Sequence, residues 1–206
     1  MKKGKFISIE GGEGAGKTTQ VKLLAGSLTA AGYEVLLTRE PGGTAIGEKI
    51  REILLDPNHT KLDLRGELLL YLASRSQLVS EVIRPALESG KVVISDRFHH
   101  STLAYQGGAR SLDLALVRRM NNFATGGLLP DITFLLDLPP LEGHKRKGPG
   151  SEIDRMEGQG IEFHEKVRQA FLSLAEEEPA RIVVLDARKP AQEIALLIKE
   201  RVLTLL

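Results

Sequence analysis

Short apolar runs alternate along the chain with longer segments in which apolar residues recur at helical spacing. Five of the runs have the length and the Val, Ile, Leu and Phe content of buried strands: Phe6–Glu10, Glu34–Arg39, Val92–Asp96, Ile132–Asp137 and Ile182–Asp186. None shows the clean alternation of a half-exposed strand, and near-continuous apolar runs are typical of a parallel sheet covered on both faces. We therefore predict a five-stranded parallel sheet.

Helical patterns lie between and after these runs. The predicted helices are Lys17–Ala31, Ile46–Leu55, Leu64–Ser89, Leu112–Phe123, Glu162–Glu177 and Ala191–Leu205. Pro85 is expected to kink or divide the third of them. Strands that alternate with helices predict an α/β fold with helices on both faces of the sheet. In such folds, ligands bind beyond the carboxyl ends of the strands.

The segment from Gly143 to Gly160 differs from the rest, because it is rich in glycine, mixed in charge and poor in apolar residues. A solvated surface loop and a short lid over the site, about residues 142–160, both fit this composition. The chain has no internal repeat and no long linker, so we predict a single domain over residues 1–206.

Composition narrows the possible partners. The 206 residues include 28 Lys and Arg against 27 Asp and Glu, and a net charge of +1 gives no reason to expect nucleic acid or an anionic membrane. Because the chain has no cysteine, disulfides, thiolate catalysis and cysteine zinc sites are excluded. The apolar run after Met1-Lys2-Lys3 ends at Glu10, which is too short for a signal peptide, and the expected location is the cytoplasm.

A phosphate-binding loop follows the first predicted strand. Gly11-Gly12-Glu13-Gly14-Ala15-Gly16-Lys17-Thr18 matches G-x-x-x-x-G-K-[ST] between a strand and a helix. Its backbone N–H groups and the helix N-terminus attract phosphate, Lys17 can reach the β- and γ-phosphates, and the Thr18 hydroxyl can hold Mg²⁺. We therefore predict ATP and Mg²⁺ as cofactors.

The loop alone does not fix the class of enzyme, because GTPases, motor ATPases and small-substrate kinases share it. GTPases usually carry an Asn-Lys-x-Asp motif after a late strand, whereas Leu185–Pro190 reads LDARKP. The chain is also short for a motor. A kinase with a small acceptor is therefore the leading hypothesis.

Arginines suited to a second phosphate group lie after the strands or on the helices that follow them. The planar guanidinium makes paired hydrogen bonds to phosphate, which makes candidates of Arg39, Arg51, Arg75 and Arg97. Arg39 and Arg51 also fit as ordinary surface charges, whereas Arg75 has apolar neighbours and needs a buried partner. Asp96 can accept from Thr18 or from Mg²⁺-bound water, although Asp96-Arg97 also fits a structural ion pair.

Ordered motifs along almost the whole chain resemble the bacterial thymidylate kinase family. They are Glu10 to Thr18, Thr38 to Thr44, Glu67 to Tyr71 with Arg75, Asp96 to Phe98, Ser101 to Gly107, Leu136 to Pro140, and Asp154 to Glu157. The resemblance implies a P-loop NTPase fold, Mg²⁺-dependent transfer of the ATP γ-phosphoryl group to thymidine monophosphate (dTMP), and usually a homodimer.

The resemblance also implies roles for individual residues. Tyr71 would stack on thymine, Arg75 would bond a base carbonyl, Thr102 would read the pyrimidine edge, and Tyr105 would crowd the sugar C2′ atom. Arg51 and Arg97 would hold the acceptor phosphate, and Glu13 would lie near the sugar and that phosphate. The predicted acceptor site comprises Glu10, Arg39, Pro41, Arg51, Tyr71, Arg75, Arg97, Thr102, Tyr105 and Gln106, and the ATP site comprises residues 11–18 with Thr19 and Arg188.

The predicted catalytic set is Lys17, Arg97 and Glu13, with a further arginine from the lid. Family members without a basic residue inside the P-loop, as here, take that arginine from the lid. Related lids often alternate arginine over residues 146–150. Here Arg146 and Lys147 are followed by Gly148-Pro149-Gly150, so Arg146 and Arg155 are the candidates.

Two other classes stay open. A kinase for another nucleoside monophosphate or for a deoxynucleoside is the nearest, and a hydroxyl acceptor would call for Glu10 or Glu13 as a base. A phosphate acceptor is already ionised and needs none, which leaves positioning and charge compensation to the protein. The other alternative is a nucleotide-dependent switch that binds ATP and a partner protein without transferring phosphate.

Overall fold

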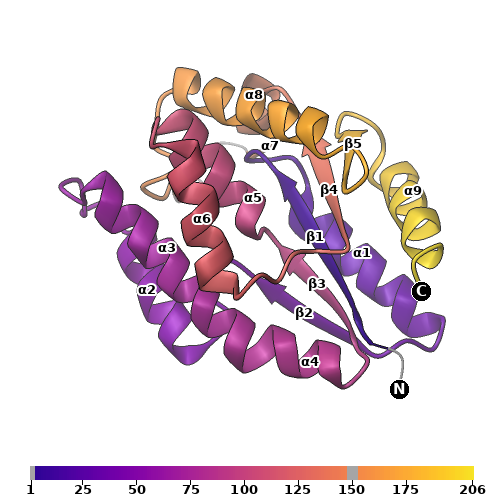
Figure 1. Ribbon diagram of the computed structural model, residues 1–206. Helices are drawn as coiled ribbons and strands as arrows, with labels where there is room; N and C mark the ends of the chain where they lie inside the picture. The colour runs from indigo at the N-terminus through magenta and orange to yellow at the C-terminus, as the bar shows by residue number, and fades with distance from the viewer. Residues whose placement is uncertain (1–2, 148–152) are drawn as a thin grey trace.

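The five predicted strands form one parallel sheet. β1 (Lys5–Gly11), β2 (Val35–Arg39), β3 (Val92–Asp96), β4 (Ile132–Asp137) and β5 (Ile182–Asp186) lie in the order β2-β3-β1-β4-β5 (Figure 1). The computed structural model describes residues 3–147 and 153–206. The predicted α/β class and the five-stranded parallel sheet are therefore confirmed.

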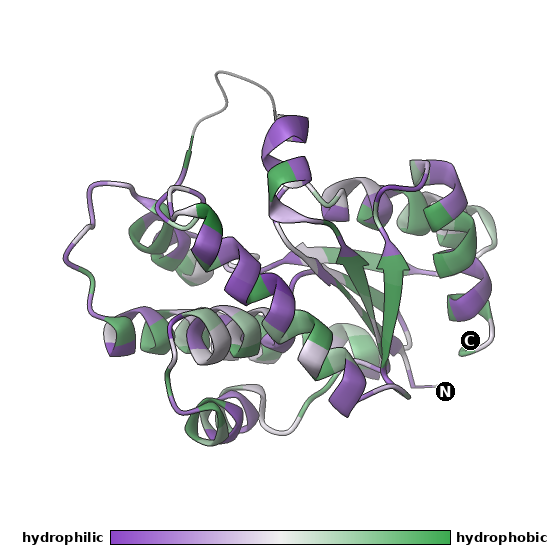
Figure 2. Cartoon of the chain, turned by 90° about the horizontal axis from the view of Figure 1, so that it is seen from above, coloured by the Kyte–Doolittle hydropathy of each residue, from purple (hydrophilic) through white to green (hydrophobic). Residues whose placement is uncertain are grey.

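Alternate side chains of each central strand enter different hydrophobic layers. Ile7 of β1 and Ile94 of β3 belong to the layer under α1 (Lys17–Ala30) and α9 (Ala191–Leu203). Phe6 and Val93, one residue before each of them, belong to the opposite layer. In Figure 2 the strands are strongly hydrophobic, whereas the helices also carry hydrophilic stretches. Burial on both faces explains why the strands read as continuous apolar runs.

The second face of the sheet is covered by more elements than the first. They are α3 (Leu64–Leu78), η1 (Val79–Ile83), α4 (Arg84–Glu88), η2 (Leu103–Ala109), α6 (Leu114–Thr125) and α8 (Ile161–Glu177). The long predicted helix is thus divided by the π-helical turn η1. Because Pro85 lacks an N–H group and its ring crowds the carbonyl four residues back, a wider turn relieves the conflict there.

Short helices complete the structure. α2 (Ala45–Leu55) packs on α3, as Figure 1 shows, while α5 (His99–Thr102) and η2 follow β3 directly. α7 (Pro140–Lys147) occupies the start of the predicted lid, where the composition had indicated a loop. The lid residues 148–152, which include Gly148-Pro149-Gly150, lie outside the described residues.

The candidate site lies at the edge of the sheet where β1 and β3 end side by side. Ile9 of β1 is in register with Asp96 of β3. The chain leaves β1 into α1 on one face and leaves β3 into α5 and η2, which pack on the other face. Such a divergence opens a crevice between neighbouring strand ends.

We expect Leu28→Ala in α1 to lower the free energy of unfolding by about 2–5 kcal/mol, because Leu28 is fully buried and its loss leaves a cavity. Leu196→Ala is the matched control, since Leu196 is also helical but 55% exposed, and it should change stability by less than about 0.5 kcal/mol. Urea unfolding followed by circular dichroism measures both. Equal effects of the two substitutions would contradict the assigned core.

Candidate functional site

The P-loop wraps around the N-terminus of α1 and packs against α7. Gly14 has a φ of 67°, and a Cβ atom there would lie 2.3 Å from the carbonyl oxygen of Gly143 in α7. A Cβ atom at Gly143 would lie 2.2 Å from the carbonyl oxygen of Glu13. Backbone therefore packs on backbone at this point, and α7 is held directly against the loop.

Lys17 lies inside the loop with little access to solvent. Its Nζ atom donates to the carbonyl oxygen of Gly12 at 2.7 Å. Burial lowers the pKa of the Lys17 ammonium to about 8, and the nearby Arg97 guanidinium lowers it further than burial alone would. The lysine is thus held where an anionic ligand would stabilise its charged form.

Thr18 joins the P-loop to the end of β3. Its hydroxyl donates to Asp96 Oδ2 at 2.7 Å, as predicted from the sequence. A hydroxyl and a carboxylate are oxygen ligands of the kind that Mg²⁺ prefers, so this pair fits the implied metal. Within residues 3–147 and 153–206 no three His, Cys, Asp or Glu side chains converge on a metal site, and a P-loop metal also takes nucleotide oxygens as ligands.

Arg97 is held in a backbone conformation that few non-glycine residues adopt. Its φ is 72°, and its N–H donates to the carbonyl oxygen of Ile9 at 2.9 Å. The buried Glu10 carboxylate accepts from the Phe98 N–H at 2.8 Å and from the Ser101 hydroxyl at 2.6 Å. Strain of this kind persists only where neighbours enforce it, and Glu10 supplies that enforcement.

The guanidinium of Arg97 is positioned from two sides. Nη2 bonds Glu13 Oε1 at 2.5 Å and Nη1 donates to the carbonyl oxygen of Gly11 at 2.9 Å. The guanidinium carbon lies 5.4 Å from the centre of the Tyr105 ring, a cation–π distance. Arg97 therefore points back across the P-loop.

Arg75 is fully buried and has the ionic partner that its apolar neighbours required. Nε and Nη2 donate to Glu40, and Nη2 also donates to the carbonyl oxygen of Phe98 at 3.1 Å. Nη1 donates to Thr102 Oγ1 at 2.7 Å and to Asn121 Oδ1 at 2.5 Å. These bonds use all five N–H groups of the guanidinium.

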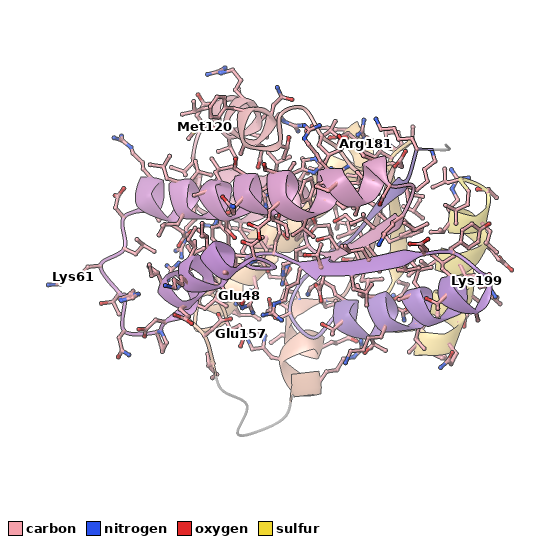
Figure 3. The ribbon with its side chains drawn as sticks, turned by 90° about the horizontal axis from the view of Figure 1, so that it is seen from below. Glu48, Lys61, Met120, Glu157, Arg181 and Lys199 are labelled. Atoms are coloured by element: carbon pink, nitrogen blue, oxygen red, sulfur yellow. The ribbon has the colours of Figure 1, made fainter. Side chains whose placement is uncertain are left out.

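A pocket of about 690 Å³ brings most of the predicted residues together. It runs from the P-loop to α2, α3 and η2, and Figure 3 labels Glu48 and Glu157 among the residues around it. The predicted residues that line it are Glu13, Lys17, Thr18, Arg39, Pro41, Arg51, Tyr71, Arg75, Asp96, Arg97, Thr102, Tyr105 and Gln106. Burial raises the pKa of Tyr71 and of Tyr105, so both phenols stay neutral at physiological pH.

Several predicted residues lie outside this pocket. Glu10 is buried behind it, Thr19 follows the P-loop on α1, and Arg146 is exposed on α7. Arg188 pairs with Asp186 after β5, with Nε 2.9 Å from Oδ1. Arg155 donates to Glu67 at 2.6 Å and to the carbonyl oxygen of Leu54 at 2.8 Å, so its guanidinium faces away from the P-loop.

Sequence reasoning assigned no role to Glu40, which lines the pocket, or to Glu67, Arg110 and Asn121, which contact lining residues from behind. Each is a polar residue whose partner is distant in sequence, such as Asn121, which is 46 residues from Arg75. Only a charged residue on the buried face of a predicted helix could have signalled such a role. Glu67 is such a residue, because it lies on the buried face of α3 two helical turns before Arg75.

Known proteins match this chain over most of its length, including the residues of the site. A family model described as thymidylate kinase matches residues 9–198. The chain belongs to the thymidylate kinase family. It is 52% identical to thymidylate kinase of Deinococcus radiodurans over 194 residues, which cover 94% of each chain. It is 51% identical to that of Syntrophotalea carbinolica over 195 residues, which cover 92% of this chain and 90% of that one.

The family assignment confirms the resemblance drawn from the motifs. It covers the P-loop, the acceptor wall and most of the last helix, since the match extends from β1 into α9. In the described part of the chain, no helix combines the length and the apolar character needed to cross a membrane. The residue roles within the site remain predictions at this point.

We expect the affinity for ATP to fall as the pH rises above about 8, by up to about tenfold per pH unit. Bound phosphates favour the charged Lys17 ammonium, so above its free-state pKa of about 8 binding must take up a proton. Titration calorimetry at pH 7, 8 and 9, in buffers of different ionisation enthalpy, measures both affinity and proton uptake.

Lys17→Arg is the control for this measurement, because a guanidinium stays charged throughout that range. Its nucleotide affinity should not vary over the same pH interval. A wild-type affinity that stays constant from pH 7 to 9 without proton uptake would contradict the assignment.

Proposed function

We propose that the protein transfers the γ-phosphoryl group of ATP to the 5′-phosphate of dTMP, giving the diphosphate and ADP. An oxygen of the acceptor phosphate attacks the γ-phosphorus, and the bond from that phosphorus to the β–γ bridging oxygen breaks. The observation that carries the proposal is the pocket, which joins the P-loop lysine to a wall containing Tyr71, Arg75, Thr102 and Gln106. Membership of the thymidylate kinase family supports it.

The donor side is held by the P-loop. Its backbone N–H groups and Lys17 would bind the β- and γ-phosphates, and Thr18 with Asp96 would hold Mg²⁺. When bound there, Mg²⁺ would offset the negative charge of the phosphates during transfer. Thr19 and Arg188 are further candidates for ATP contacts, on the P-loop side and after β5 respectively.

The acceptor phosphate would lie against Arg97, with Arg39 and Arg51 on the opposite wall. Arg51 donates to the carbonyl oxygen of Pro41 at 2.9 Å, so its guanidinium already lies at the pocket. Glu13 and Glu10 fix Arg97 before any substrate arrives, and positioning of this kind is what phosphoryl transfer requires. No side chain needs to act as a base, because the acceptor oxygen is already ionised.

The base would be read through Thr102 and Gln106. The oxygen of Thr102 accepts from Arg75, which leaves the hydroxyl hydrogen free to donate to thymine O4. Arg75 would therefore act on the base through Thr102, rather than by the direct bond expected from the sequence. Tyr71 would stack on the ring and Tyr105 would crowd a ribose 2′-hydroxyl.

Arg146 is the stronger candidate for the catalytic lid arginine. It lies three residues after Gly143, the point at which α7 packs on the P-loop, so its distance from the phosphates is set by that contact. Arg155, by contrast, is engaged by Glu67 and by the end of α2. We therefore assign Arg155 a role in holding the pocket wall.

We further propose a homodimer that works in the cytoplasm, where nucleotides are pooled. The exposed side of α3 carries Leu69, Ala73 and Ser76 at helical spacing, Ser80 of η1 continues it, and Leu69 is 55% exposed. Phe123 of α6, the helix that packs beside α3, is 89% exposed. Exposed apolar side chains on two helices that pack side by side support an interface at this face.

The test of the reaction is ADP release with ATP and Mg²⁺ in the presence of dTMP, the other common nucleoside monophosphates, or free thymidine. We expect dTMP to be preferred, and Arg97→Ala to lower kcat/KM for dTMP on the order of 10²–10³-fold because it removes a charged donor to the transferring group. Arg201→Ala on α9, distant from the pocket, is the control and should match the wild type.

The other outcomes separate the alternatives. Preference for a different monophosphate would keep the kinase and remove the base-site assignment. Preference for free thymidine would make the acceptor a hydroxyl and call for a base. ADP release with none of the acceptors would favour a nucleotide-dependent switch.

We expect the wild type to sediment as a dimer at micromolar concentration, and Leu69→Glu to shift it to the monomer because the new charge would be buried in the interface. Leu196→Glu is matched in exposure, since Leu69 and Leu196 are both 55% exposed, and it should leave the dimer intact. Analytical ultracentrifugation distinguishes these cases. A monomeric wild type, or a dimeric Leu69→Glu protein, would contradict the proposed interface.

A further inference from the structure

A buried carboxylate lies directly behind the base-reading wall. Glu67 of α3 is fully buried, and side chains from two other segments contact it. Gln106 Nε2 of η2 donates to Oε1 at 2.9 Å, and Arg155 Nη1 lies 2.6 Å from Oε2. Arg110 spans both oxygens at 3.4 Å and 3.3 Å.

These contacts determine which end of the Gln106 amide faces the pocket. A carboxylate accepts hydrogen bonds and does not donate them, so only the NH₂ group of Gln106 can turn towards Glu67. The carbonyl oxygen of the amide is then the group left for the pocket that Gln106 lines. At the neighbouring position, Thr102 is left as a donor by Arg75.

We propose that Glu67 is a positioning residue that locks the amide of Gln106 with its carbonyl oxygen towards the acceptor base. The inference rests on the proposed function, in which Gln106 faces the pyrimidine. In thymine, N3 carries a hydrogen and O4 accepts, so the carbonyl of Gln106 and the hydroxyl of Thr102 match it. In cytosine, N3 accepts and the 4-amino group donates, so both contacts are mismatched.

Glu67 cannot easily turn away from Gln106, because the rest of the cluster holds it. Arg155 is itself fixed by two bonds to the end of α2, from its N–H to the carbonyl oxygen of Leu55 and from Nε to that of Leu54. Arg110 also donates to Gln159 Oε1 at 3.1 Å, and its guanidinium lies 4.8 Å from the centre of the Phe163 ring. The carboxylate therefore has one available orientation.

Glu67→Gln tests the lock, because it should reverse the orientation of the Gln106 amide. Arg155 would donate to the new carbonyl oxygen, so the new NH₂ group would face Gln106. Because an NH₂ group only donates, it would pair with the carbonyl oxygen of Gln106. The NH₂ group of Gln106 would then face the pocket. We expect the ratio of kcat/KM for dTMP to that for deoxycytidine monophosphate to fall by about tenfold or more, which corresponds to one exchanged hydrogen bond.

Two further variants separate this effect from a loss of structure. Glu67→Gln with Arg110→Met removes one negative and one positive charge, so the cluster keeps its net charge, and the same fall in the ratio is expected. Arg110→Met alone leaves the bond from Gln106 to Glu67 in place and should keep the wild-type ratio. A lower melting temperature without a change in the ratio would show a merely structural role and overturn the proposal.

A measurement on the wild type does not depend on folding of the variants. The 3-deaza analogue of dTMP has C–H at position 3 and, as a 4-hydroxy-2-pyridone, a hydroxyl in place of the O4 carbonyl, so its kcat/KM should be about tenfold or more below that of dTMP if Gln106 presents an acceptor and Thr102 a donor. An analogue as good as dTMP, or better, would overturn the lock. Failure of dTMP itself to support ADP release would instead reject the proposed function, which distinguishes the two.

Discussion

The carboxylate of Glu10 connects the two loops from which the site is built. It lies one residue before the end of β1, the strand before the P-loop, and accepts hydrogen bonds from Phe98 and Ser101, which follow β3. Arg97 lies between the end of β3 and the start of α5, and its φ is 72°. Without a buried acceptor at this point, the turn would relax to a commoner conformation, and the guanidinium would leave the P-loop. The position of the Arg97 guanidinium therefore depends on a residue that does not line the pocket.

The same arrangement recurs around the pocket, where three arginines in or behind its wall are each held by a carboxylate. Arg97 has Glu13, Arg75 has Glu40, and Arg155 has Glu67. Burial of ion pairs is costly in free energy, and such pairs are weak evidence for stability. Their value here is geometric, because charges fixed before the substrates bind need no reorganisation during phosphoryl transfer. Arg146, by contrast, is exposed on α7.

The sheet, most helices and the P-loop could be predicted from the sequence because each is encoded locally. Continuous apolar runs indicate strands that are buried on both faces of the sheet. The glycine-lysine-threonine pattern between a strand and a helix is typical of a phosphate-binding loop. Helix α7 could not be predicted, since its residues are polar and it is held by the contact between Gly14 and Gly143, which joins two distant segments. The partners of Arg75 could not be predicted for a similar reason: the sequence shows a buried arginine, but not that Glu40, Phe98, Thr102 and Asn121, which lie far from it along the chain, accept from all its N–H groups.

In the proposed reaction, that saturation would change how selectivity for the base arises. A free arginine offers several donors in a fork and tolerates a displaced carbonyl, whereas the hydroxyl of Thr102 offers one hydrogen whose direction is set by the bond it accepts from Arg75. Gln106 is constrained in the opposite sense by Glu67, which takes the NH₂ group and leaves an acceptor. Arg75 thus leaves the Thr102 hydroxyl as a donor towards the pocket, and Glu67 leaves the Gln106 amide as an acceptor. Mismatch with cytosine then leaves buried polar groups unpaired, and that penalty discriminates more strongly than the matched bonds attract.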